Sequence, residues 1–328
     1  MRETRPPHAG SGGLRFAAPT RRALMAAATA SAAASLVPTR YALAQPRSEV
    51  HAFKVGAAEI VVISDGVMDL PTRLMLPERE TLEIGAVFKA NGQTFSAAFR
   101  AEVNVAVIRT GKEVILVDTG GGPDFMPTLG KLYERLTVAG VKPEAVTKVV
   151  FTHAHPDHLW GVIDPFGGDT LFEQAEHVMS VSERDFWLQA GAETRVPEHF
   201  QGIAAGTRRR LAVIAARIIT VKPGHEVVPG VELIDTSGHT PGHVSVVVRS
   251  GGEQLMIGSD VLTQHIISFA EPGWRWGPDM DADKAIASRR RTLDRLATDR
   301  MRLLGYHLPW PGLGNVERKG TSYRFIAD

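Results

Sequence analysis

The segment Thr152-His153-Ala154-His155-Pro156-Asp157-His158 is the most informative part of this chain. It holds three histidines and one aspartate, and it directly follows the apolar run of Lys148–Thr152, which predicts a buried strand. Imidazole nitrogens and carboxylate oxygens are the ligands that zinc and similar divalent metals accept. Because alternate side chains after a strand turn toward one point, we expect the first two histidines to reach one ion. The aspartate and the third histidine are expected to face a second ion beside it.

Further ligands have to come from elsewhere, because a metal site needs three or four of them. Three candidates each follow a predicted strand: His239, Asp260 and His307. His239 lies in the segment Ser237-Gly238-His239-Thr240-Pro241-Gly242-His243. The second histidine of that segment, His243, is expected to support the site rather than to bind a metal.

The composition excludes several classes of function. The chain has 328 residues with 44% hydrophobic and 22% charged side chains, enough apolar material for a large core. With 37 Lys+Arg against 36 Asp+Glu the net charge is +1, which argues against a nucleic-acid partner. There are no cysteines, so thiolate ligands, thiol nucleophiles and disulfides are excluded. No apolar run is suited to a membrane span in the mature chain.

Residues 1–44 have the pattern of an export signal. Arg21 and Arg22 precede a weakly apolar, alanine-rich stretch, and Ala42-Leu43-Ala44 forms a small-x-small cleavage site. The paired arginines indicate the twin-arginine type and hence a periplasmic or secreted protein. The alternative is an alanine-rich amphipathic helix at the start of a cytosolic protein. On the first interpretation, residues 45–328 form one domain.

The rest of the chain shows two series of strands, each accompanied by helices. Strands are predicted for the following ranges: 55–64, 103–109, 113–117, 148–152, 177–181, 218–221, 231–235, 244–249, 254–257, 303–306 and 323–326. Helices are predicted for the following ranges: 127–139, 182–189, 197–214 and 283–300. Within the last helix, the run Arg289-Arg290-Arg291 is expected to face solvent. Two sheets face to face with helices outside them form a four-layer αββα sandwich, an α/β (α+β) fold.

The ligand pattern resembles the metallo-β-lactamase superfamily: a His-x-His-x-Asp-His motif, a Gly-His-Thr-Pro-Gly-His motif, an aspartate after a strand and a final histidine. Shorter segments are similar to the methyl parathion hydrolase branch of that superfamily. These segments are Leu116-Val117-Asp118-Thr119-Gly120, Phe125-x-Pro127-Thr128-Leu129-Gly130, Asp185-Phe186-Trp187, His307-Leu308-Pro309-x-Pro311-Gly312 and Gly320-x-x-Tyr323-Arg324-Phe325. Together they extend over about residues 50 to 326.

The resemblance implies a role for each matching side chain. One metal would be held by His153, His155 and His239, and the other by Asp157, His158 and His307. Asp260 would bridge the two ions, and Asp118 would be a buried carboxylate that supports the loop carrying the ligands. The chain departs from the family at Ser259, where relatives commonly have glycine.

Two divalent ions, zinc by preference but with manganese, cobalt or iron as alternatives, would activate a shared water for hydrolysis. Asp157 or Asp260 is the expected carboxylate for proton transfer. Phe125, Trp187 and Phe200 match an aromatic substrate pocket in the resembling branch, and ordinary core packing is the alternative for them. Such a pocket would suit a small neutral substrate, namely a phosphotriester, a lactone or an aryl ester.

Three other functions fit parts of the pattern. A β-lactamase is disfavoured by the bridging aspartate and by the missing cysteine ligand that some of these enzymes use. A mono-iron sulfur dioxygenase on the same fold would not need the second set of ligands. A non-catalytic metal-binding protein would hold metal without turnover. The resemblance also implies a possible homodimer.

Overall fold

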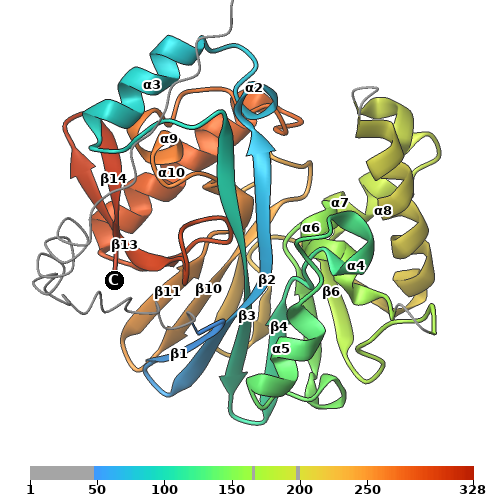
Figure 1. The fold of residues 1–328 in the computed structure, drawn as a ribbon. Helices are drawn as coiled ribbons and strands as arrows, with labels where there is room; N and C mark the ends of the chain where they lie inside the picture. The colour runs from blue at the N-terminus through green and yellow to red at the C-terminus, as the bar shows by residue number, and fades with distance from the viewer. Residues whose placement is uncertain (1–47, 165–166, 197–199) are drawn as a thin grey trace, which may run out of the picture. The chain divides into compact units, whose positions relative to one another are not determined.

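The computed structural model describes residues 48–164, 167–196 and 200–328 (Figure 1). The predicted export signal, residues 1–44, lies outside the described residues. The described chain forms two seven-stranded sheets and the helices around them. Among its helices, none has both the length and the apolar character needed to cross a membrane.

The first sheet follows the order of the sequence. Its strands are β1 (Val50–Val55), β2 (Ala58–Pro71), β3 (Ala98–Thr110), β4 (Glu113–Val117), β5 (Lys148–Phe151), β6 (Glu176–Ser180) and β7 (Ile218–Val221). Strands β1 to β4 pair antiparallel, and β4 to β7 pair parallel. The carboxyl ends of β4 to β7 therefore meet at one edge of this sheet.

The second sheet is mostly antiparallel. Its strands, in spatial order, are β14 (Ser322–Ala327), β13 (Leu313–Lys319), β12 (Arg302–Leu304), β11 (Glu253–Ile257), β10 (Val244–Ser250), β9 (Val231–Asp235) and β8 (Glu226–Val228). Both β9 and β11 pair antiparallel with β10, while β11 and β12 pair parallel. As a result β9, β11 and β12 run in the same direction and end at the same edge.

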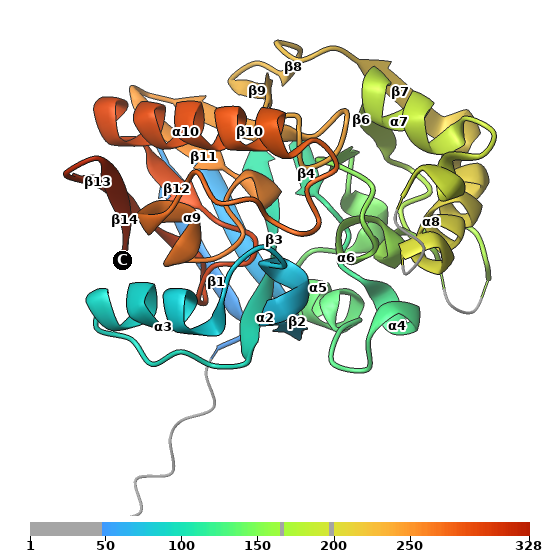
Figure 2. The same cartoon turned by 90° about the horizontal axis from the view of Figure 1, so that it is seen from above.

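Helices cover the outer faces of the two sheets (Figures 1 and 2). Those on the side of the first sheet are α4 (Gly122–Phe125), α5 (Leu132–Val138), α6 (Pro156–Leu159), α7 (Val181–Leu188) and α8 (Gln201–Ile214). Those on the side of the second sheet are α9 (Ile267–Ala270) and α10 (Ala282–Asp299), while α2 (Thr72–Met75) and α3 (Thr81–Ala90) follow β2. This arrangement confirms the predicted αββα sandwich.

The alternation of side chains along β2 shows why four layers form. Ile60 and Val62 belong to the core between the two sheets, whereas Val61 and Ile63 belong to the core under the helices of the first sheet. Successive side chains of a strand point to opposite faces, so a strand that is apolar at every position needs cover on both sides. Each such side chain contributes about 1.5–3 kcal/mol when fully buried. A second sheet on one face and helices on the other supply that cover.

For two of the predicted elements, the structure shows why the limits differ from the prediction. The strand predicted for 55–64 is interrupted by a turn at Gly56, whose φ is +54° and which approaches Ser250 too closely for a side chain. The helix predicted for 127–139 begins only at Leu132. The reason is that the backbone N–H groups of Gly130 and Leu132 donate to the buried carboxylate of Asp65, which holds the preceding residues in a loop.

Candidate metal centre

The side chains singled out in the sequence gather where strands of both sheets end. In the first sheet, β5 leads directly into His153 and the parallel β4 leads into Asp118. In the second sheet, His239, Asp260 and His307 follow β9, β11 and β12 respectively. Because these strands run in the same direction within each sheet, loops far apart in the sequence meet at one place.

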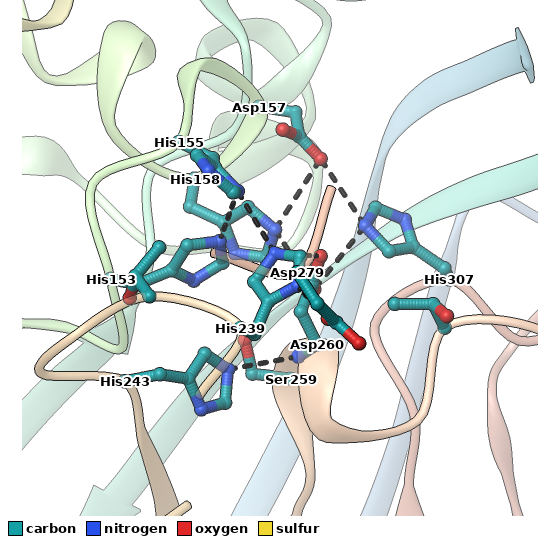
Figure 3. A network of polar contacts seen from close by, with 12 residues as sticks. His153, His155, Asp157, His158, His239, His243, Ser259, Asp260, Asp279 and His307 are labelled. Carbon is teal, nitrogen blue, oxygen red and sulfur yellow. Dashed lines mark hydrogen bonds and ion pairs between the residues drawn. The ribbon is translucent and has the colours of Figure 1, made fainter. Parts of the chain in front are cut away.

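Four of these residues form a first group, shown in Figure 3: His153, His155, His239 and Asp260. Nδ1 of His155 lies 3.1 Å from Nε2 of His153 and 2.9 Å from Nε2 of His239. Oδ2 of Asp260 lies 3.3 Å from Nε2 of His239. Three imidazole nitrogens and one carboxylate oxygen therefore face a common point, which we call position 1.

A second group consists of Asp157, His158 and His307. Oδ2 of Asp157 lies 3.3 Å from Nε2 of His158 and also 3.3 Å from Nε2 of His307. The other oxygen of Asp260, Oδ1, lies 3.1 Å from Nε2 of His158 and 3.3 Å from Nε2 of His307. Asp260 thus presents one oxygen to each group, and we call the point that the second group faces position 2.

The donor atoms at both positions fit divalent cations. Nε2 of His158 and Oδ1 of Asp260 are buried and face each other at 3.1 Å, but neither atom makes a hydrogen bond of good geometry with any described residue. At position 1, burial lowers the pKa of His153 well below 6.5 and that of His155 to about 3, so both rings are neutral. Neutral imidazoles present ring-nitrogen lone pairs, and three of them that face a common point together with a carboxylate oxygen suit a divalent cation.

The carboxylates give position 2 a strong preference for positive charge. Burial acts to lower the pKa of His307, but Asp260 and Asp157 outweigh it and raise that pKa to about 10. The pKa of Asp260 lies well below its usual value although burial opposes this, because His307 and His158 face it. A site that binds a proton so firmly also attracts a metal ion, which competes with the proton for the same lone pairs.

Each of three ligand histidines has its other ring nitrogen held by an acceptor. Nδ1 of His158 lies 2.8 Å from Oδ2 of Asp118, and Nδ1 of His239 lies 2.9 Å from Oδ1 of Asp279. Nδ1 of His307 lies 2.8 Å from the backbone oxygen of Glu102. In each ring the Nδ1 proton is donated outward, which directs the Nε2 lone pair toward the metal position.

Ser259 lies beside this network in a strained conformation. Its φ of +51° is in the left-handed region, which glycine adopts far more easily than other residues. Its hydroxyl lies 2.8 Å from that of Thr152, which in turn donates to Asp118 over 2.7 Å. The hydrogen bond offsets part of the strain, which explains how serine is tolerated at a position whose backbone favours glycine.

Glu183 on α7 joins the two loops that supply position 1. It is fully buried, and its Oε1 accepts from the backbone N–H of Ala154 and from the indole of Trp187. Its Oε2 accepts from the hydroxyl of Thr240 and from the backbone N–H of Gly242. Ala154 lies between His153 and His155, and Thr240 follows His239. One carboxylate therefore fixes the positions of the two loops relative to each other.

A cavity of about 280 Å³ opens directly onto the two metal positions. The three aromatic residues predicted for a substrate pocket, Phe125, Trp187 and Phe200, all line it. Phe99 and Trp276 form a further aromatic part of the lining, with their rings stacked at a centroid distance of 5.7 Å. The cavity is thus mostly apolar, with ligand side chains at one end.

Comparison with known proteins identifies the family. The family model of the metallo-β-lactamase superfamily matches residues 99–307. The chain belongs to the metallo-β-lactamase superfamily. The superfamily resemblance drawn from the motifs is confirmed, whereas the narrower assignment to the methyl parathion hydrolase branch stays a prediction.

Two solved structures of similar size support the superfamily assignment. AidC, a dizinc quorum-quenching lactonase solved with the product N-hexanoyl-L-homoserine, is 28% identical with a TM-score of 0.80, covering 86% of this chain and 98% of its own. The hydrolase AbOPH is 26% identical with a TM-score of 0.80, covering 87% of this chain and 99% of its own.

Curated relatives match over shorter lengths. Metallo-beta-lactamase domain-containing protein 1 of Xenopus laevis is 28% identical over 55% of this chain and 60% of its own length. The uncharacterized protein YobT of Bacillus subtilis is 29% identical over 38% of this chain and 52% of its own length. The chain therefore matches just over half the length of these curated relatives.

Sequence reasoning identified the residues that converge in the metallo-β-lactamase site but missed several that hold them. Asp279 lies in a segment with no histidine nearby and no motif. Glu183 lies two residues before the segment Asp185-Phe186-Trp187, but nothing in that segment marks Glu183 itself as a residue of the site. Tyr306 had a usable signal, since it directly precedes His307. Its ring stacks on His158 at a centroid distance of 4.0 Å, and its hydroxyl donates to the backbone oxygen of Asp157.

Proposed function

We propose that this chain is a dinuclear metal-dependent hydrolase that cleaves neutral esters or lactones carrying an apolar group. The observation that carries the proposal is the mostly apolar cavity whose lining includes five of the seven converging side chains: His155, Asp157, His239, Asp260 and His307. When bound, two divalent cations, zinc by preference, supply Lewis acidity toward the ester oxygen and lower the pKa of water. The similarity to a dizinc lactonase over most of both chains supports this choice.

The apolar lining selects the substrate class. Aromatic side chains from five separate segments line the cavity: Phe99, Phe125, Trp187, Phe200 and Trp276. They give it an apolar surface against which an acyl chain or an aromatic leaving group can be buried. Two arginines, Arg100 and Arg195, also contribute to the lining, and both are exposed. Among the described lining residues there is no buried arginine or lysine that could bind a polyanionic substrate. The cavity therefore favours neutral substrates.

Asp157 is the best-placed proton acceptor in the site. Its Oδ2 faces His158 and His307, and Figure 3 shows the other oxygen pointing away from these contacts. The residue also lines the cavity. We assign Oδ1 of Asp157 the role of taking a proton from the attacking water and returning it to the leaving group. Asp260 is less suited to this role, because each of its oxygens already faces a metal position.

A substrate screen tests the proposal. The purified full chain, loaded with zinc, manganese, cobalt or iron(II), is assayed against N-acyl homoserine lactones, aryl esters, p-nitrophenyl phosphotriesters and a cephalosporin. Turnover of at least one of the first three classes, lost on chelation and restored by metal, is the expected result. If only the cephalosporin is hydrolysed, the protein is a β-lactamase. Metal binding without turnover of any member would point to a metal-binding protein.

We also infer that residues 1–44 direct export and that residues 45–328 form the hydrolase domain. The paired arginines, the alanine-rich stretch and the cleavage site at Ala44 support the inference. Changing Arg21 and Arg22 to lysine should retain the protein in the cytoplasm, as measured by cell fractionation. Size-exclusion chromatography with light scattering tests the expected homodimer.

A further inference from the structure

Arg289 on α10 is buried, contrary to the prediction that its run of three arginines faces solvent. It is only 3% exposed, whereas the next residue, Arg290, is exposed. A buried guanidinium requires a charge partner and hydrogen-bond acceptors, since its removal from water is otherwise strongly unfavourable. Arg289 has both, and they lie in the loop between α9 and α10, residues 271–281.

The contacts of Arg289 hold this loop at several points. Its Nη1 donates to the backbone oxygens of Pro272 and Trp274, over 3.3 and 3.0 Å. Its Nη2 donates to Oδ2 of Asp279 over 2.9 Å. The same loop carries Trp276 into the wall of the cavity. One side chain thus fixes both the cavity wall and the carboxylate of Asp279.

Asp279 passes this support on to a ligand of position 1. Its side chain is fully buried, and its Oδ1 accepts from Nδ1 of His239 over 2.9 Å (Figure 3). Two backbone hydrogen bonds hold the loop against the same histidine, from the N–H of Met280 to the oxygen of His239 and from that of Asp281 to the oxygen of Gly238. His239 is therefore oriented by the loop that Arg289 holds.

Position 2 depends on a different network. His158 donates to Asp118, which is held by the backbone and hydroxyl of Thr152. Asp118 forms an ion pair with His158, and no arginine or lysine of the described residues pairs with it. A change at Arg289 or Asp279 can therefore act on position 1 while the support of position 2 stays intact.

We propose that Arg289 and Asp279 form a positioning pair that sets the metal affinity of position 1 separately from that of position 2. Asp279 fixes the tautomer and orientation of His239 through its hydrogen bond, and Arg289 orients the Asp279 carboxylate through the ion pair. The inference rests on the proposed dinuclear centre but does not depend on which substrate is cleaved.

Stepwise removal of zinc tests this inference. The full chain, loaded with two zinc ions, is titrated with a competing chromophoric chelator, and the zinc released per chain is recorded. In Asp279→Asn, one zinc ion should leave at about 10–100-fold lower chelator concentration, while the second is released as in the wild type. Arg289→Lys should give a smaller shift of the same ion. The neighbouring, exposed Arg290→Lys is the matched control and should leave both steps unchanged.

The double variant tests whether the pair acts in series. Because Arg289 acts through Asp279, adding Arg289→Lys to Asp279→Asn should change zinc release little further. The inference is wrong if both single variants, folded by circular dichroism, release zinc as the wild type does, or if both ions shift together. A wild-type chain that binds fewer than two zinc ions overturns it too. Since no substrate is used, these results are independent of the turnover that tests the proposed function.

Discussion

Replacing Glu183 with glutamine tests how the two ligand loops are held together. The wild-type carboxylate accepts four hydrogen bonds, two at each oxygen. A glutamine of nearly the same shape keeps one oxygen as an acceptor and converts the other into an NH₂ donor. If the oxygen stays with Ala154 and Trp187, the NH₂ group faces the hydroxyl of Thr240, which can rotate to accept, and the N–H of Gly242, which cannot.

The expected loss of stability follows from this count. At least one buried N–H is left without an acceptor, at about 1–3 kcal/mol, and the remaining bonds lose their charge assistance. Glutamine carries no charge, so the cost of burying the carboxylate disappears, and this offsets part of the loss. We therefore expect Glu183→Gln to lower the free energy of unfolding by about 3 kcal/mol.

Urea unfolding of the chelated, metal-free chain measures this effect without a contribution from bound metal. Glu176→Gln is the matched control: its side chain is 54% exposed and pairs with Lys148 at the surface, so its effect should stay below about 1 kcal/mol. If Glu183→Gln is as stable as this control, with an unchanged slope against urea, the carboxylate does not hold the loops together and the reasoning fails.

Three further predictions concern the site itself. His153→Ala and Asp260→Ala should each abolish turnover and lower the metal content measured by elemental analysis; full activity in either would refute the ligand assignment. Ser259→Ala, which keeps the strained φ and loses the hydrogen bond to Thr152, should lower the free energy of unfolding by about 1 kcal/mol. Ser259→Gly should change it less, because relief of strain offsets that loss, and equal urea midpoints for the two variants would contradict this account. Trp187→Ala enlarges the cavity and should shift kcat/KM toward substrates with larger apolar groups. The substrate preference should change more than the metal content. Unchanged relative rates across an ester panel would argue against the substrate pocket.

Much of the fold follows from local patterns in the sequence. The run Glu113–Val117 is β4 with the predicted limits, and Val231–Asp235 likewise is β9. In both, a short apolar or alternating segment is bounded by turns, so the local pattern and the tertiary fold favour the same structure. The prediction was less accurate where a distant group acts on the backbone. The helix at Leu132 starts late because Asp65, far away in the sequence, accepts the preceding N–H groups.

The chemical character of the site was likewise predictable from the spacing of its histidines and aspartates. Four of the seven converging side chains lie within six residues after β5, two of them before α6 and two on α6, so their closeness along the chain brings them together. The remaining three, His239, Asp260 and His307, follow other strands. Each could be identified in the sequence because a histidine or aspartate close to a glycine, just after a predicted strand, is an uncommon pattern.

The sequence by itself therefore determined the layered fold and the types of the ligand side chains. It also determined that these side chains lie at the carboxyl ends of strands. The tertiary structure alone decided which groups orient those ligands and which charges are buried. Arg289 and Arg290 are adjacent and chemically identical, yet one is enclosed by the loop before α10 and the other faces water. Burial of a charge depends on whether distant segments bring it a partner, and no local pattern records that.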